Sequence, residues 1–472
     1  MKRVGLSSFV LLALIFSLAA AVGLAKEITF LTVGYSGELI NYLRNEVVPE
    51  FRENYGADVV MLTANWNTRM ERIIVLTAGG TPPDVVCTGA YSPYEEGSLG
   101  MLEPLDNYLA RWPLTPRFSK GLWDAVSWRG RIYAVPQNLS LRGIAYNKEL
   151  YAEVGLDPER PPMSWDELTQ FAQRLTRVEG DMVAVQGIKL ETTPAGAAQW
   201  FFWFLRQAGV AEIDSDQMTS NLMRPEAIDA LQTLQELYAA GQHGLPVMSG
   251  AYVKGREAMR WLFPSGVSSM IAQDPDIMGR TGVFAPRRTP ESRPVAHVFA
   301  NGLAIPSASK NKDLAWEWIS SLYQDDVLYE IQRISWFFSG RLDFLNRMRE
   351  VQPGIEYWYA MDQYIQASVF PPPRDVSQQE LGNQVLKAWR LETSPLAALE
   401  QTHALWTRLL ADWKADIESR YRKPISKADI ESRYRKPIAG GAPHEVSRQE
   451  GGPGHQLIGV GGSDRSSRRG DH

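Results

Sequence analysis

Residues 121–175 read GLWDAVSWRGRIYAVPQNLSLRGIAYNKELYAEVGLDPERPPMSWDELTQFAQRL. The pattern predicts a short strand over Arg131–Val135, which ends at a proline because proline fixes its backbone angle and lacks an N–H donor. A polar crossing at Gln137–Ser140 leads to a second strand that runs into Asn147, and a helix opens at Ser164. This order of strand, polar crossing, strand and helix is the most specific feature of the chain.

The bulk composition limits the classes of protein to which the chain can belong. Its 472 residues exceed what one hydrophobic core supports, so two domains are expected. Hydrophobic residues make up 44% and charged residues 22%, which are the proportions of a soluble globular protein. The net charge of -5 argues against a nucleic-acid partner, which would reward dense clusters of Lys and Arg.

The amino terminus predicts the compartment. Lys2 and Arg3 precede an apolar run that ends in small residues at Ala25, the pattern of a signal peptide over residues 1–25 that is cleaved on secretion. An uncleaved membrane anchor is the alternative, because the run approaches the roughly 20 residues that span a bilayer. The single cysteine, Cys87, lies in an apolar run far from the cleavage site and is expected to be a small buried hydrophobe. We therefore expect a free periplasmic protein without a lipid anchor.

Strands and helices alternate after the signal peptide. Strands are predicted over Glu27–Val33, Ala57–Leu62 and Asp84–Cys87, and the segments between them carry apolar residues at helical spacing. This alternation implies an α/β layer on a mainly parallel sheet, in which ligands bind where the strands end. The loops that follow the three strands are therefore expected to line one cleft: Tyr35–Ser36, Trp66–Asn67 and Thr88–Tyr91.

The order of elements in residues 121–175 resembles that of the extracellular solute-binding proteins of bacterial ABC importers. The resemblance is to the carbohydrate-binding group that includes the maltose- and glycerol-phosphate-binding proteins, and Ala300–Pro306 followed by a helix over Asp313–Leu322 looks like the return strand and docking helix of that family. The resemblance implies an α/β, two-lobed periplasmic-binding-protein fold with three interlobe crossings and a hinge. The expected crossings are Gln137–Ser140, the proline-rich loop Gly282–Pro294, and Ser335–Gly340.

The predicted domain limits follow from these crossings. Lobe one comprises residues 26–138 and 286–335, and lobe two comprises residues 139–285 and 336–425, including helices over Ser377–Arg390 and Pro395–Trp413. The segment KADIESRYRKPI occurs at Lys414–Ile425 and again at Lys427–Ile438, which indicates a local duplication rather than a solenoid. Residues 426–472 therefore hold the second copy and a Gly-, Ser- and Arg-rich tail that is expected to be disordered.

Enzymatic signatures are missing from the sequence. It contains no G-x-x-x-x-G-K-[ST] loop, H-E-x-x-H helix or G-x-S-x-G elbow, and its six histidines show no metal-ligand spacing. No metal or cofactor is expected. The rival reading is a secreted glycoside hydrolase, which would need two carboxylates, such as Asp274 with Asp276 or Asp84 with Glu95. We predict a binding protein rather than an enzyme.

Aromatic residues carry the positive signal for a sugar ligand. Sugar rings pack C–H faces on indole, and their hydroxyls need a few placed donors and acceptors. Trp200 and Trp203 lie three apart on one side of a predicted helix; core packing is the alternative, but the resembling proteins place such a pair in the cleft. Arg374 follows three prolines and could bind a phosphate bidentately. The predicted ligand-binding residues are Tyr35, Ser36, Trp66, Asn67, Tyr91, Asn138, Trp200, Trp203, Asp274, Asn301, Gly302, Trp336 and Arg374.

The resemblance implies the extracytoplasmic substrate-binding subunit of an ABC importer. Such a subunit would bind a sugar or oligosaccharide as a monomer and deliver it to the permease subunits in the membrane. A polyol or a glycerol-phosphate ester is the alternative ligand. Contacts made by both lobes exist only in the closed form, so the ligand would shift the balance between open and closed forms.

Overall fold

The computed structural model describes residues 26–66, 68–89, 92–241, 244–248, 251–366 and 368–422, of which 420–422 are described by their backbone only. All of these residues belong to one compact unit. The predicted signal peptide, the duplicated second copy and the tail lie outside the described residues, as do Asn67 and Tyr91. Within the described ranges, no helix combines the length and the apolar character that a bilayer crossing requires.

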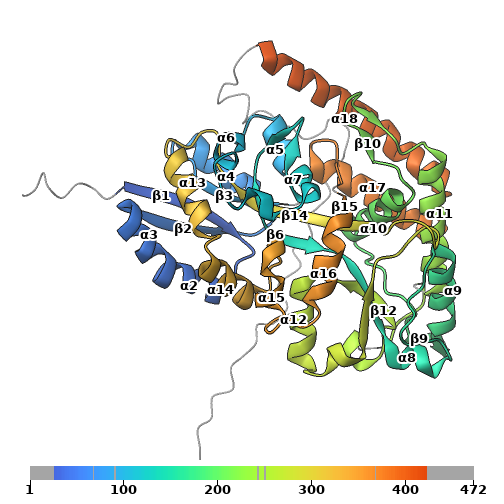
Figure 1. Cartoon of the computed structure of the whole chain (residues 1–472). Coiled ribbons are helices and arrows are strands. Elements are labelled where there is room, and N and C mark those ends of the chain that lie inside the picture. The colour runs from blue at the N-terminus through green and yellow to red at the C-terminus, as the bar shows by residue number, and fades with distance from the viewer. Residues whose placement is uncertain are drawn as a thin grey trace, which may run out of the picture. The chain divides into compact units, whose positions relative to one another are not determined.

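The larger sheet has the strand order β15-β14-β3-β1-β2, and β6 also pairs with β14. β1 is parallel to β2 and β3, as the sequence predicts, whereas β14 is antiparallel to β3 and β6 and parallel to β15 (Figure 1). The return strand therefore enters the sheet against the direction of the first three strands. The six strands are β1 (Lys26–Val33), β2 (Ala57–Ala64), β3 (Val85–Thr88), β6 (Val135–Leu141), β14 (Ala296–Ala304) and β15 (Ile365–Gln366).

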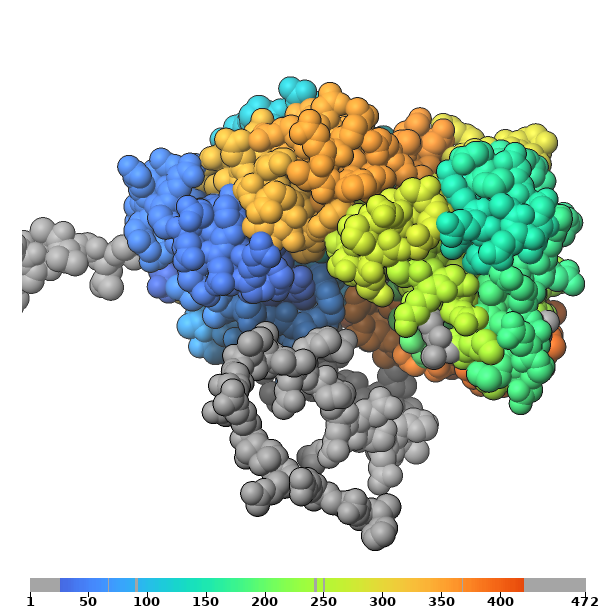
Figure 2. Space-filling model, turned by 90° about the horizontal axis from the view of Figure 1, so that it is seen from below, coloured from blue at the N-terminus to red at the C-terminus, as the bar shows by residue number. Residues whose placement is uncertain are grey.

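Helices from two distant parts of the chain cover this sheet. The ring of Trp318 on α13 meets Phe51 on α3 at 5.2 Å and Phe30 on β1 at 6.1 Å, so the return helix packs on the first strand–helix unit. In Figure 2 the blue surface of the first residues accordingly adjoins the yellow and orange surface of α13 and α14. The helices of this part are α2 (Gly37–Tyr42), α3 (Val48–Tyr55), α4 (Arg69–Ala78), α5 (Ser92–Ser98), α6 (Asp106–Leu109), α7 (Lys120–Ala125), α13 (Lys312–Ser321) and α14 (Asp325–Ser335).

A second, antiparallel sheet has β7 at its centre, between β12 and β13. Helix α10 packs against α11 and α17, and α17 packs against α18. The strands are β7 (Gly143–Asn147), β12 (Met259–Leu262) and β13 (Thr281–Phe284). The helices are α8 (Lys148–Glu153), α9 (Trp165–Leu175), α10 (Pro194–Gln207), α11 (Pro225–Ala240), α12 (Pro264–Gln273), α15 (Leu345–Met348), α16 (Ile355–Met361), α17 (Arg374–Trp389) and α18 (Pro395–Arg422).

Two of the three predicted crossings, Gln137–Ser140 and Ser335–Gly340, lie side by side, and the strand that follows the third predicted crossing, β14, pairs with the first. β6 pairs with β14 on one side, and on the other side Leu139 donates its N–H to the carbonyl of Phe338 at 2.9 Å. Three backbone segments therefore run next to one another, as expected of a hinge: Val135–Leu141, Ala296–Ala304 and the segment after α14. The lobe limits drawn from the sequence stay a prediction.

Two details of the crossing prediction are wrong. Pro136 does not end a strand: it lies inside β6, opposite Gly302, next to a register shift between Asn301 and Gly302. The missing N–H is tolerated at such an irregularity, and the Pro136 carbonyl accepts a 2.6 Å hydrogen bond from the Tyr323 hydroxyl. The predicted loop from Gly282 also begins too early, because β13 continues to Phe284.

Three short hairpins complete the described strands. Each consists of two antiparallel strands whose pairing is local in sequence. They are β4 (Ser127–Trp128) with β5 (Arg131–Ile132), β8 (Arg177–Glu179) with β9 (Met182–Val185), and β10 (Ile213–Asp214) with β11 (Thr219–Ser220). The strand predicted over Arg131–Val135 is thus divided between β5 and β6.

Candidate functional site

Trp66 is an exposed aromatic side chain at the carboxyl ends of the parallel strands. It follows β2 and is 42% exposed. Its ring lies beside the residues that follow β1 and β3: a Cβ built on Gly34 would lie 3.4 Å from the Trp66 Nε1, and one built on Gly89 would lie 3.6 Å from its Cζ3. Gly34 also has a φ of +75°, which disfavours any larger residue. Glycine at both positions therefore leaves room for the indole beside the strand ends.

Arg374 reaches the same place from the other part of the chain. It is the first residue of α17, and the Cβ built on Gly89 would lie 3.7 Å from its Nη1. The guanidinium also donates to the Asp375 carboxylate, from Nε at 3.0 Å and from Nη2 at 2.5 Å. Trp66 and Arg374 thus approach each other over Gly89.

Two adjacent carboxyl groups on α5 stand beside this point. Glu96 is buried and accepts two hydrogen bonds from Arg69 on α4, at 2.5 and 2.9 Å. Glu95 is 8% exposed and accepts a long hydrogen bond, 3.5 Å, from the Arg374 backbone N–H. Burial raises the pKa of Glu95 to about 7, although the Arg374 guanidinium acts in the opposite direction. The Glu95 carboxyl is therefore a titratable group at the site edge.

Asn138 and Asn301 lie opposite each other on the two crossing strands β6 and β14. Both are half-buried. The pair Gly302–Thr88 joins β14 to β3, so the next residues, Asn301 and Gly89, follow at the same end of the sheet. Asn138 and Asn301 therefore lie at the same end of the sheet as Gly89. Amides supply both donors and acceptors, as sugar hydroxyls require.

The other predicted residues of these loops have partners within the protein. The Tyr35 hydroxyl donates to Gln137 Oε1 at 2.5 Å, which ties the end of β1 to β6, and its ring meets Phe337 edge-on at 5.7 Å. Ser36 caps α2, because its Oγ accepts the Leu39 N–H at 3.1 Å. Gly302 allows the close pairing of β14 with β6, because a Cβ at this position would lie 2.6 Å from the Val135 carbonyl oxygen.

Trp200 and Trp203 are fully buried, each with 0% exposure. Trp200 stacks on Trp261 of β12 with ring centres 4.6 Å apart, and Trp203 donates its Nε1–H to the Val295 carbonyl at 2.8 Å. The structure therefore does not bring this pair to the exposed strand-end edge, and their predicted role as ligand platforms stays a prediction.

Asp274 and Trp336 end helices. Asp274 follows α12, where it accepts the Asp276 N–H at 3.1 Å and pairs with Arg280. Trp336 is half-buried and ends α14 with a φ of 56°. The structure does not group either residue with Trp66.

Two of the carboxylates proposed for a hydrolase, Asp84 and Asp274, have partners within the protein. Asp84 precedes β3, where it accepts hydrogen bonds from the Thr29 N–H at 2.9 Å and the Ser309 hydroxyl at 2.6 Å, while Glu95 lies beyond the other end of β3. Asp274 is engaged by Arg280. No cluster of three His, Cys, Asp or Glu side chains that could hold a metal ion occurs in the described part of the chain.

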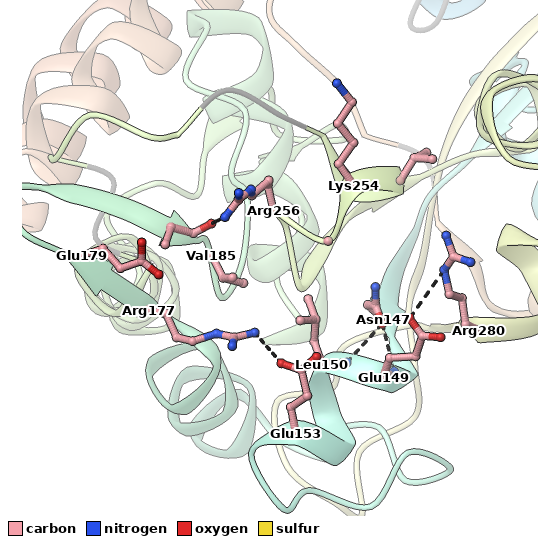
Figure 3. A pocket seen from close by; sticks show the side chains of 13 residues that line it. Asn147, Glu149, Leu150, Glu153, Arg177, Glu179, Val185, Lys254, Arg256 and Arg280 are labelled. Atoms are coloured by element: carbon pink, nitrogen blue, oxygen red, sulfur yellow. Dashed lines mark hydrogen bonds and ion pairs between the residues drawn. The ribbon is translucent and has the colours of Figure 1, made fainter.

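A polar pocket of about 420 Å³ lies between α8, β8 and the loop after η3 (Tyr252–Lys254) (Figure 3). Its charged side chains are largely engaged with one another: Arg177 pairs with Glu153 at 2.7 Å, and Arg280 with Glu149 at 3.8 Å. None of its lining residues is aromatic. It offers no stacking surface for a sugar, so the strand-end edge around Trp66 is the better candidate.

The sequence pattern missed part of this site. Gly34 and Gln137 were not among the predicted ligand residues, Gly89 was predicted only as part of the cleft loop Thr88–Tyr91, and Glu95 was considered only for hydrolysis. The rule that ligands bind where parallel strands end could have indicated the two glycines, since both follow predicted strands. Nothing in the local sequence indicates that Arg374, 279 residues from Glu95, packs beside it.

Comparisons with known proteins show the family and the fold. The family profile described as bacterial extracellular solute-binding protein matches residues 36–328. A binding protein of Brucella abortus is 25% identical over 314 residues, which are 64% of this chain and 73% of that protein. The mannitol-binding protein of Pseudomonas aeruginosa is 25% identical over 306 residues, 62% of this chain and 67% of that protein. The sugar-binding protein MalE of Xanthomonas citri has a similar fold, with a TM-score of 0.71 at 20% identity over 83% of this chain and 99% of that one.

Proposed function

Because this chain belongs to the bacterial extracellular solute-binding protein family, we propose that it binds a sugar or oligosaccharide at the strand-end edge around Trp66 and delivers it to the permease subunits of an ABC importer. The protein acts as a single chain in the periplasm and carries out no reaction. A hinge at the three adjoining crossing segments brings the two predicted lobes together on the ligand.

The observation that carries this proposal is the exposed indole of Trp66 above two glycines. An indole face that is 42% exposed can pack against the C–H face of a sugar ring. The amides of Asn138 and Asn301 stand at the same end of the sheet and can bind hydroxyls as donors or acceptors. One apolar platform with a few polar groups is the usual composition of a small-molecule site.

The named ligands of the relatives support polyhydroxy compounds as the ligand class. One relative is a mannitol-binding protein, and one protein of similar fold is the sugar-binding protein MalE. Polyols present the same hydroxyl chemistry as sugars but lack a rigid ring to stack on Trp66. A polyol is therefore the second candidate, and the exposed indole favours a ring.

A glycerol-phosphate ester is less well supported. Arg374 is the cation that would bind its phosphate, and in this structure the guanidinium already donates twice to Asp375. The Glu95 carboxyl beside it would also oppose an anion when ionised. A neutral ligand meets neither obstacle.

A thermal-shift screen of sugars, polyols and phosphodiesters tests the proposal, because a ligand that binds only the folded state raises the unfolding midpoint. We expect a neutral sugar to raise it in the wild type and, at the same concentration, to raise it less in Trp66→Ala. Val75→Ala is a matched control, since Val75 is an apolar side chain that is 61% exposed on α4. A screen in which no sugar or polyol moves the midpoint would refute the proposal, and a response to phosphodiesters alone would replace it with the glycerol-phosphate alternative.

A further inference from the structure

The long carboxyl-terminal helix α18 is anchored to the helices of the second sheet. Trp406, which is fully buried, donates its Nε1–H to the Ser377 carbonyl of α17 at 3.2 Å. Its ring also lies edge-on to Phe202 of α10 and to Phe370, at 6.1 Å from each. The first part of α18 is therefore held rigidly against α10 and α17, both in predicted lobe two.

The last turns of α18 contact a different part of the molecule. The Trp413 ring stacks on Trp128 of β4 with ring centres 4.6 Å apart, and its Nε1–H donates to the Ser98 hydroxyl of α5 at 2.9 Å. Trp413 is only 2% exposed. Figure 1 shows the red end of α18 reaching towards α5. Trp128 and Ser98 both lie in predicted lobe one, so this one helix joins the two lobes.

Helix α5 connects this contact with the candidate site. Its first turn approaches Arg374 through Glu95. The neighbouring Tyr94 hydroxyl accepts the Phe370 N–H at 2.5 Å and donates to the Phe370 carbonyl at 3.2 Å. Its last residue, Ser98, receives the Trp413 N–H. One seven-residue helix of lobe one thus contacts the carboxyl-terminal segment at both of its ends.

We propose that Trp413, packed on Trp128 and Ser98, is an interlobe latch that stabilises the arrangement in which Arg374 and Trp66 both lie beside Gly89. A rotation at the hinge that moves α17 away from Gly89 also moves α18, because Trp406 ties the two helices together. Trp413 would then leave Trp128. The latch is made in only one arrangement of the lobes, so it shifts the equilibrium between arrangements even without ligand. It rests on the two-lobed hinge of the proposed function but not on the identity of the ligand.

The test is the distance between two spin labels in the ligand-free protein, measured by double electron–electron resonance. Labels are attached at Glu53→Cys on α3 and Glu236→Cys on α11, both exposed positions, while the native Cys87 is buried and stays unlabelled. Trp413→Ala should reduce the population ratio of the latched distance to longer distances about tenfold, which is what losing an aromatic pair costs. Asp412→Ala, on the exposed face of the same turn, should leave the distribution unchanged.

A Trp413→Ala distribution that superimposes on that of the wild type would overturn the latch. Ser98→Ala removes the hydrogen bond from Trp413, together with the bond that the Ser98 hydroxyl donates to the Glu95 carbonyl within α5, and should reduce the ratio about threefold. That variant, together with Trp413→Phe, decides the question if Trp413→Ala does not fold. Because no ligand is present, a negative result here leaves the sugar-binding proposal standing, and a failed ligand screen leaves the latch standing.

Discussion

The single tryptophan Trp66 and the pair Trp200 and Trp203 have opposite surroundings. Trp66 stands at the end of β2 with 42% of its surface exposed, whereas Trp200 and Trp203 in α10 have none exposed. The buried pair meets rings and a backbone carbonyl, Trp261 on one side and Val295 on the other. The exposed ring instead lies beside two glycines.

The difference shows that position in the fold, rather than residue type, separates a binding group from a core group. A tryptophan after a parallel strand lies where the helices that cover the sheet leave an opening. A tryptophan inside a helix that packs on α11 and α17 has neighbours on every side. Stability should therefore depend on the buried pair Trp200 and Trp203, and ligand binding should depend on the exposed Trp66.

The largest expected effect is a difference in stability between variants of the buried pair and variants of Trp66. Trp203→Ala should lower the free energy of unfolding by about 3–5 kcal/mol, since it leaves a cavity and an unpaired Val295 carbonyl. Trp66→Ala should change it by about 0.5 kcal/mol or less, as for other surface substitutions. Chemical denaturation measures both. Equal destabilisation by the two variants would contradict the assignment of stability to the buried pair and of ligand binding to Trp66.

Glu95 should make stability depend on pH at the exposed edge. Its pKa is raised by burial to about 7, so the folded protein holds a proton that the unfolded chain releases near pH 4.3. The stabilisation is complete below about pH 4.3 and is lost as the pH rises through about 7. Between pH 5 and pH 8 the wild type should lose ~2–3 kcal/mol relative to Glu95→Gln, which cannot ionise.

Urea denaturation of the wild type and Glu95→Gln at both pH values measures this effect. Asp362, whose pKa burial raises to about 6, titrates in the same range but is present in both proteins, so its contribution cancels. Parallel pH profiles for the two proteins would show that Glu95 is already ionised below pH 5.

Trp66→Ala should weaken binding of the sugar found in the thermal-shift screen by about 2 kcal/mol, roughly thirtyfold, as for an aromatic hot spot. Isothermal titration calorimetry measures the affinity. Trp66→Phe keeps a smaller stacking face and should recover part of the loss. An affinity that is the same in Trp66→Ala and the wild type would move the site away from the strand-end edge.

The strands and helices were largely predictable because their patterns are local. The strand predicted at Glu27–Val33 is β1, Lys26–Val33, and the helix predicted at Asp313–Leu322 is α13, Lys312–Ser321. The error at Pro136 has a different origin. Whether a proline fits inside a strand depends on the partner strand, and the register shift opposite it lies in β14, more than 150 residues away.

Only the part of the site that follows from the topology of the parallel strands could be predicted from the sequence. Loops after parallel strands converge whatever their sequence, so Trp66 and Tyr35 could be expected near one another. The surroundings of Trp200 could not, because the ring that covers it, Trp261, belongs to a strand 61 residues later in the chain. Arg374 could be proposed for its charge, but its pairing with Asp375 depends on side-chain geometry.

The smallest effect concerns Ser36, which follows β1 and caps the amino terminus of α2. Ser36→Ala should lower the free energy of unfolding by about 1 kcal/mol, because the Leu39 N–H at the start of α2 loses its acceptor. Ser36→Asn retains a capping oxygen and should restore most of that stability. Neither variant should change ligand affinity if Ser36 acts only as a cap. A loss of affinity in Ser36→Ala with stability preserved would instead extend the binding site from Trp66 across the end of β1.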